Sequence, residues 1–170
     1  MSNPHQEWSG FRASPGKLPP GWSARGDQTT SAYVASSHPD SNLGGASAGA
    51  AVAVSAGFAP IAIATETDGG VIVPASRAAL YAIKPAVGKV PMDGVVPVGP
   101  SMDSVGVMGK SAWDIAATLE VMVGEEAKYR YLDAIEEGWE GLRVGVLRGG
   151  GFWDREVVGE QVWLPGFLTD

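Results

Sequence analysis

Hydrophobic positions change their spacing several times along this chain, and each change predicts a different element. A run of alanines and valines over Ser47–Ala56 ends at Gly57, which is typical of a short buried helix. Apolar residues then continue through Ala59–Thr67 with alternating isoleucines, which predicts a buried strand that ends in a turn. Isoleucine, leucine, methionine and valine recur at helical spacing over Ser111–Val123, where Ser111 is the expected N-cap. The chain is therefore expected to pass from helix to strand and back to helix.

Weaker patterns predict three shorter elements. Pro74 suits the first turn of a short helix that ends near Leu80, and Tyr81–Lys84 is expected to be a brief strand. Leu142–Leu147 has the composition of a buried strand, and three glycines follow it. Pro, Ser, Gly and Asp are frequent before Gly44. We therefore divide the chain into an irregular segment over 1–43, a core over 44–147 and a C-terminal extension over 148–170.

The amino-acid composition disfavours several classes of binding partner and cofactor. A chain of 170 residues with 45% hydrophobic and 18% charged residues contains enough apolar surface for one globular domain. Its net charge of −7 disfavours nucleic acid and anionic membranes as partners. Cysteine is absent and the only histidines are His5 and His38, so we expect neither a metal site nor a cofactor. Neither a signal peptide nor a membrane span is apparent, so a cytoplasmic protein is expected.

One long stretch resembles a known family. It runs from GGASAGAAVAVSAGFAP through ATETDGGVIVPAS to MDSVGVMGKSAWDIA, and it resembles the core of the amidase signature family. The resemblance covers roughly residues 20–147 and implies an α/β fold with a mixed β-sheet flanked by helices. Enzymes of that family are more than twice as long, so the sheet is expected to be incomplete. Its open edges favour self-association or a partner protein that covers them.

The same resemblance identifies the positions where catalysis would occur. The family uses a serine nucleophile, a bridging serine held on a cis peptide bond, and a lysine that accepts the proton. Here the bridging position is Ala46 and the nucleophile position is Gly70, which lie 24 residues apart, as the serines of the family do. The lysine of the family lies farther upstream than the 45 residues before Ala46, so we expect this chain to lack it. Neither alanine nor glycine supplies a nucleophilic atom, so covalent acyl transfer is not expected.

Main-chain N–H groups can still donate hydrogen bonds when positions 46 and 70 lack a serine hydroxyl. In the family the oxyanion hole comes from N–H groups of the turn before the nucleophile, which here comprises Thr67, Asp68 and Gly69. A small amide or carbonyl ligand is therefore the expected small-molecule partner.

Ser47 and two other features could carry different chemistry. Ser47 is the centre of a G-x-S-x-G pattern, but no strand precedes it and no histidine follows it, so we interpret it as an N-cap or first-turn hydroxyl and keep it as a weak catalytic candidate. Residues 104–111 resemble a phosphate-binding loop without its first glycine, and no clear strand is expected to lead into them. Glu66, Asp68 and Asp103 could form a carboxylate cluster, although each has a turn-like context.

Four of the six tryptophans are expected to be core or interface anchors rather than a stacking platform. They are Trp113, Trp139, Trp153 and Trp163.

Three functions stay open at this point. The first is a degenerate, amidase-like scaffold or binding module without amidase activity. The second is a hydrolase-family or acyl-transfer enzyme of a biosynthetic pathway that needs another subunit. The third is catalysis in the inherited pocket without a nucleophile, such as a cyclisation.

Overall fold

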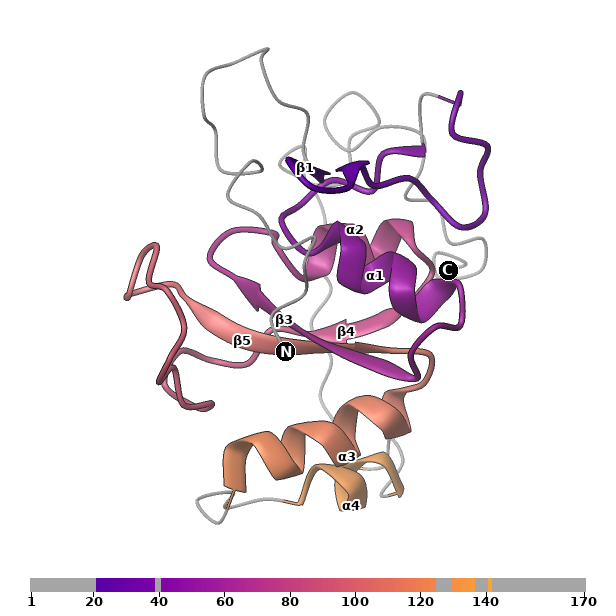
Figure 1. The fold of residues 1–170 in the computed structure, drawn as a ribbon. Helices are drawn as coiled ribbons and strands as arrows, with labels where there is room; N and C mark the ends of the chain where they lie inside the picture. The colour runs from indigo at the N-terminus through magenta and orange to yellow at the C-terminus, as the bar shows by residue number, and fades with distance from the viewer. Residues whose placement is uncertain (1–20, 39–40, 125–129, 137–140, 142–170) are drawn as a thin grey trace, which may run out of the picture. The chain divides into compact units, whose positions relative to one another are not determined.

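The computed structural model describes residues 21–38, 41–124, 130–136 and 141. A small hairpin, β1 (Trp22–Ser23) and β2 (Asp27–Gln28), precedes the main α/β unit. That unit comprises α1 (Ala48–Ser55), β3 (Ile61–Glu66), α2 (Ile72–Arg77), β4 (Tyr81–Ile83), β5 (Ser104–Gly109), α3 (Ala112–Val123) and α4 (Tyr131–Glu136). Figure 1 shows helices on both faces of the sheet. The α/β architecture expected from the sequence is confirmed.

The main sheet has the strand order β3-β5-β4, and both of its strand pairs are antiparallel. Ile61 pairs with Gly109 on one side of β5, and Tyr81 pairs with the same glycine on the other. Strands β3 and β4 therefore run in the same direction with β5 between them. Helix α2 makes the crossover that connects them.

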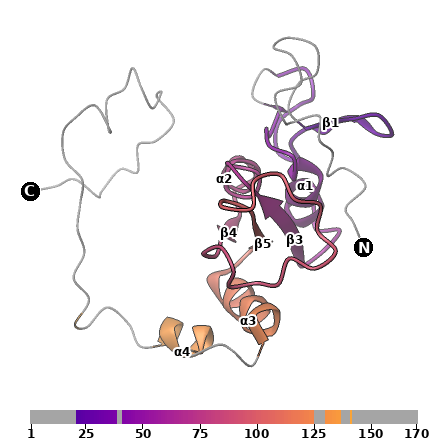
Figure 2. The ribbon, with the colours of Figure 1, turned by 90° about the vertical axis from the view of Figure 1, so that its left-hand side faces the viewer.

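Helices α1 and α2 cover one face of the sheet (Figures 1 and 2). The predicted helix over Ser47–Ala56 is confirmed with bounds one residue shorter at each end, and Gly57 follows it with φ +83°. Small side chains let α1 approach both α2 and the sheet closely. The core under these helices consists of Leu43, Ala48, Ala50, Ala51, Ala64, Val71, Ala75, Ala78 and Met108.

Helix α3 covers the opposite face and packs on α4 (Figure 1). The expected helix is confirmed with its N-cap, because the Ser111 hydroxyl accepts a hydrogen bond of 3.1 Å from the Asp114 N–H. Gly124 ends the helix with φ +69°. Leu119 and Val123 are buried with Val90 and Val105 in the core of this face.

The central strand β5 is a feature that the sequence prediction missed. We expected no strand next to the loop-like residues 104–111, but Ser104–Gly109 is buried along its whole length. Gly106 explains why a glycine-rich segment occupies this place, because a β-carbon there would lie 2.4 Å from the Ile83 carbonyl oxygen. The close approach of β4 requires a residue without a side chain.

Exposed side chains correct two further expectations. Trp113 is 55% exposed on α3, so of its two expected roles the core role is wrong and the interface role stays a prediction. Ile63 on β3 is also 55% exposed, so the strand predicted as buried leaves one face uncovered by the described residues. The predicted strand over 142–147, His5, and the tryptophans at 139, 153 and 163 lie outside the described residues. Among the helices that can be described, none is long and apolar enough to cross a membrane.

Candidate functional site

The structure brings the two sequence motifs together at one end of α1 and α2. Gly44 and Gly45 both adopt positive φ, +67° and +68°, and lead the chain into α1. A β-carbon on Gly45 would lie 2.8 Å from Cδ of Pro74 and 3.4 Å from the Gly69 carbonyl oxygen. The Arg77 guanidinium donates a hydrogen bond of 3.0 Å to the Asn42 carbonyl. The glycine-rich segment and the turn into α2 are therefore in direct contact.

Ala46 lies in the turn that leads into α1 and is partly buried. The peptide bonds of the described residues are all trans, including those on either side of Ala46, whereas the resemblance implies a cis bond there. The next residue, Ser47, occupies the N-cap position of α1, but its side chain makes no capping hydrogen bond. Its buried hydroxyl instead donates a long hydrogen bond of 3.5 Å to the Thr65 carbonyl. Ser47 is therefore the N-cap residue, as expected, but its hydroxyl does not cap the helix.

Gly70 lies in the turn between β3 and α2, against the main chain of β3. A β-carbon on Gly70 would lie 2.7 Å from the Thr65 carbonyl oxygen and 3.5 Å from Cα of Glu66. Approaches below 3.0 Å essentially do not occur for real β-carbons. This backbone therefore leaves no room for a side chain at position 70, whether serine or alanine.

Thr67, Asp68 and Gly69 form the turn that follows β3. Gly69 has φ +77°, and its carbonyl accepts a hydrogen bond of 3.1 Å from Val73 N–H. The main-chain N–H groups of Asp68 and Gly69 donate to no acceptor among the described residues. The turn thus presents main-chain donors beside the contact of the two motifs.

Glu66 is buried at the end of β3, next to this turn. Its Oε2 accepts hydrogen bonds from the N–H groups of Val71 and Ile72, at 2.7 and 2.8 Å. These N–H groups belong to the beginning of α2, where the helix has donors without an intrahelical partner. Glu66 therefore stabilises the start of α2, a role that its position six residues before the helix could have suggested.

Asp103 is buried at the beginning of β5 and connects two loops. Its Oδ1 accepts a hydrogen bond from the Thr67 hydroxyl, and its Oδ2 accepts bonds of 2.8 and 2.9 Å from the N–H groups of Val98 and Gly99. The Thr67 hydroxyl holds the pKa of Asp103 below its ordinary value, assisted by the two main-chain N–H groups and by the charge of Lys84, against the opposing effect of burial. The carboxylate is thus kept ionised.

The three carboxylates considered from the sequence do not form a cluster. Glu66 and Asp103 bind main-chain and hydroxyl donors, while Asp68 is exposed. Over the part of the chain that the structure describes, no three His, Asp or Glu side chains gather as metal ligands. Residues 104–109 form a strand rather than a phosphate-binding loop.

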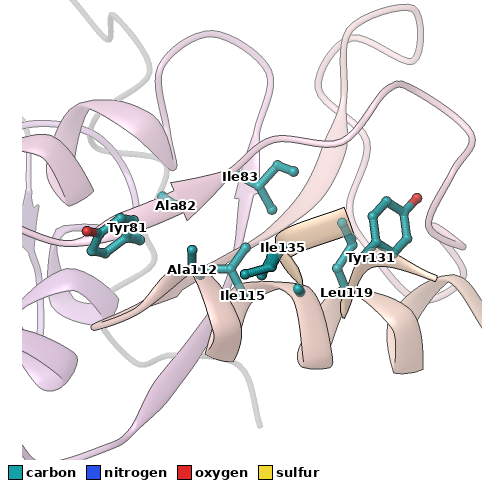
Figure 3. A pocket seen from close by; sticks show the side chains of 9 residues that line it. Tyr81, Ala82, Ile83, Ala112, Ile115, Leu119, Tyr131 and Ile135 are labelled. Atoms are coloured by element: carbon teal, nitrogen blue, oxygen red, sulfur yellow. The ribbon is translucent and has the colours of Figure 1, made fainter. Parts of the chain in front are cut away.

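A separate apolar groove of about 260 Å³ lies on the other face of the sheet, between β4, α3 and α4 (Figure 3). Its lining includes Tyr81, Ile115, Leu119, Tyr131 and Ile135. The residues that line the groove include none of the predicted site residues.

The sequence of this chain is similar to those of known proteins. The family model described as Amidase matches residues 28–156, which include the glycine-rich segment, the turn 67–70 and β5. The chain belongs to the Amidase family. Within this family, its sequence is 35% identical over 154 residues to a glutamyl-tRNA(Gln) amidotransferase subunit of Psychrobacter cryohalolentis, a match that covers 78% of this chain and 31% of that protein. It is 38% identical over 136 residues to a protein of Arabidopsis thaliana named a probable amidase, a match that covers 78% of this chain and 25% of that protein.

Solved structures of Amidase proteins match the same region. The peptide amidase of Stenotrophomonas maltophilia is 38% identical with a TM-score of 0.55, over 69% of this chain and 23% of that enzyme. An amidase family protein of Bacillus anthracis is 28% identical with a TM-score of 0.59, over 71% of this chain and 23% of that protein. The chain spans about a quarter of the length of the curated relatives it matches. The resemblance to the amidase signature family is confirmed.

Proposed function

We propose that this chain is the core of a degenerate Amidase protein that does not hydrolyse amides by itself. It acts as a scaffold or binding module that keeps the shape of the site. The observation that carries the proposal is position 70, where the family motif calls for the nucleophile. Glycine supplies no attacking atom, and the Thr65 carbonyl oxygen occupies the space that a side chain would need.

The proposal extends to position 46, where alanine supplies no hydroxyl to transfer a proton. Ser47 is adjacent, but its buried hydroxyl is directed at the Thr65 carbonyl. Ser47 is therefore assigned a structural role.

A ligand for this site would be a small amide or carbonyl compound. Main-chain N–H groups of Asp68 and Gly69 bind no acceptor among the residues that the structure describes, so they can donate to a carbonyl oxygen as the oxyanion hole of the family does. Such donors do not depend on the lost side chains. Binding without covalent chemistry is the function that these residues support best.

Labelling with a fluorophosphonate, together with hydrolysis of small aryl and alkyl amides, tests the loss of chemistry. We expect neither labelling nor turnover, while a competent amidase assayed alongside shows both. The variant with both Ala46→Ser and Gly70→Ser should also stay unlabelled, because the backbone at position 70 excludes the new side chain. A covalent adduct on Ser47 that disappears in Ser47→Ala would overturn the assignment.

A second candidate is a hydrolase or acyl-transfer step that requires a further protein. It is favoured by the relatives that are named as one subunit of a glutamyl-tRNA(Gln) amidotransferase. The exposed Ile63 on β3 also supports a partner, or a second copy of this chain, that covers the sheet. Activity confined to a stoichiometric complex would favour this candidate. A chain that is fully active without added protein would contradict both candidates. A monomeric native mass would argue against a second copy of this chain that covers the sheet at Ile63.

A further inference from the structure

The turn over Thr67–Gly69 is called the donor turn below, because it presents main-chain N–H groups. A loop next to it carries an exposed apolar side chain. Residues 98–102 precede β5, and the N–H groups of Met102 and Asp103 both donate to the Gly99 carbonyl, at 2.8 and 2.9 Å. These bonds close the loop on itself. Met102 is 51% exposed, so its apolar side chain is accessible to a ligand.

The Met102 side chain and Thr67, the first residue of the turn over Thr67–Gly69, both lie next to Gly99. A β-carbon on Gly99 would lie 3.4 Å from Cγ2 of Thr67 and 3.6 Å from Cε of Met102. The two methyl groups therefore border the same small space beside Gly99. A substituent of a bound ligand that reaches this space can contact both methyl groups.

Two charged residues hold the loop in place. The Asp103 carboxylate binds the Thr67 hydroxyl with one oxygen and the N–H groups of Val98 and Gly99 with the other. On the far side, the Lys84 ammonium donates a hydrogen bond of 2.8 Å to the Met102 carbonyl. Charge-assisted hydrogen bonds of this kind are stronger than those between neutral groups.

We propose that Met102 is a specificity-determining residue that selects amide or carbonyl ligands with an apolar substituent, and that Asp103 and Lys84 are its positioning residues. The inference rests on the proposed function, because it requires a carbonyl oxygen bound at the turn over Thr67–Gly69. It adds the chemical class of the group attached to that carbonyl. Methionine suits this role because its thioether chain adapts to apolar groups of different shape.

Acetamide and butanamide are matched probes, since they share the amide and differ by two methylenes. Each methylene removed from water is worth about 0.8 kcal/mol, about fourfold in affinity. We expect ¹⁵N-labelled protein to show shifts of the Asp68 and Gly69 amide signals with both compounds. Partial burial of two methylenes gives butanamide an advantage of roughly tenfold in Kd.

In Met102→Ser that advantage should fall to about twofold, while the Kd of acetamide stays within about twofold of the unmodified protein. Met102→Gln, which keeps the length of the side chain, provides a second variant if the serine variant does not fold. Lys84→Met should also reduce the preference for butanamide, whereas Lys89→Met, an exposed lysine in the adjacent loop, should not. Asp103→Asn should reduce the preference and Asp103→Glu should restore part of it.

The outcomes separate the two proposals. If neither amide shifts the turn signals, the proposed function and this inference both fail. If both amides shift them with equal affinity, or if Met102→Ser and Met102→Gln keep the full preference for butanamide, the ligand site stands and the role of Met102 is overturned.

Discussion

The hydroxyl of Ser47 donates a hydrogen bond of 3.5 Å to the carbonyl of Thr65, which ties the beginning of α1 to β3. The same carbonyl oxygen would lie 2.7 Å from a β-carbon on Gly70. One main-chain oxygen therefore links the glycine-rich segment to the position where the family motif calls for the nucleophile. Ser47 binds that oxygen through its hydroxyl, and Gly70 leaves space for it by having no side chain.

Gly70→Ala should destabilise the fold. The added methyl group must displace either the Thr65 carbonyl or the turn, and overpacking of this kind costs about 1–3 kcal/mol. Gly99→Ala is the matched control, since its β-carbon meets only ordinary contacts at 3.4 and 3.6 Å. Urea unfolding followed by circular dichroism measures both variants. Equal stability of the two variants would show that the main chain beside Gly70 yields easily.

A double-mutant cycle tests the link between Ser47 and Gly70. Ser47→Ala alone should cost about 1 kcal/mol, the usual net worth of a hydrogen bond. Without that hydroxyl the Thr65 carbonyl is freer to move, so the Gly70→Ala penalty should shrink by about 0.5 kcal/mol or more. The free energies of unfolding of the four proteins give the coupling. Additivity within about 0.3 kcal/mol would argue against a shared carbonyl.

Asp103 should make stability depend on pH in the acid range. Because its pKa is lowered in the folded state, chiefly by the Thr67 hydroxyl, the folded protein binds fewer protons than the unfolded chain as the pH falls. The stabilisation is fully present above the ordinary pKa of 3.8 and is lost as the pH falls through the lowered value.

The measurement is urea unfolding of the unmodified protein and Asp103→Asn at a series of pH values. The unmodified protein should be the more stable one near pH 7, and the difference should shrink below about pH 4. Asp93→Asn, at an exposed carboxyl, should change stability little. A difference that stays constant down to pH 2 would mean that the charge of Asp103 contributes nothing.

Ser111→Ala should weaken the beginning of α3. The hydroxyl accepts from the Asp114 N–H at 3.1 Å and donates to the Asp114 carboxylate at 2.7 Å, and loss of an N-cap costs about 1 kcal/mol. Hydrogen exchange of amides in the first turn of α3 should rise in this variant. Ser101→Ala, at an exposed serine outside any helix, should leave exchange in α3 unchanged. Unchanged exchange in both variants would mean that packing alone holds the helix end.

Local signals were sufficient for most helices and for both edge strands of the main sheet. Helix α3 combines a periodic apolar face with a capping serine and a terminal glycine, and each of these acts within a few residues. Helix α1 was predicted from its alanine-rich run and Gly57. The resemblance to the Amidase family was also a property of the sequence, because its motifs keep their order and spacing.

The sequence by itself determined the identity of the residues at the two motif positions, Ala46 and Gly70, and hence which atoms are available there. Tertiary structure decided what surrounds them. Strand β5 was not predicted because the need for a glycine at Gly106 arises only from the close Ile83 carbonyl of a neighbouring strand. The Thr67–Asp103 contact likewise joins residues 36 positions apart, and no local pattern encodes it. The residue types at positions 46 and 70 can be read from the sequence, whereas the carbonyl beside position 70 is placed there by the packing of separate elements.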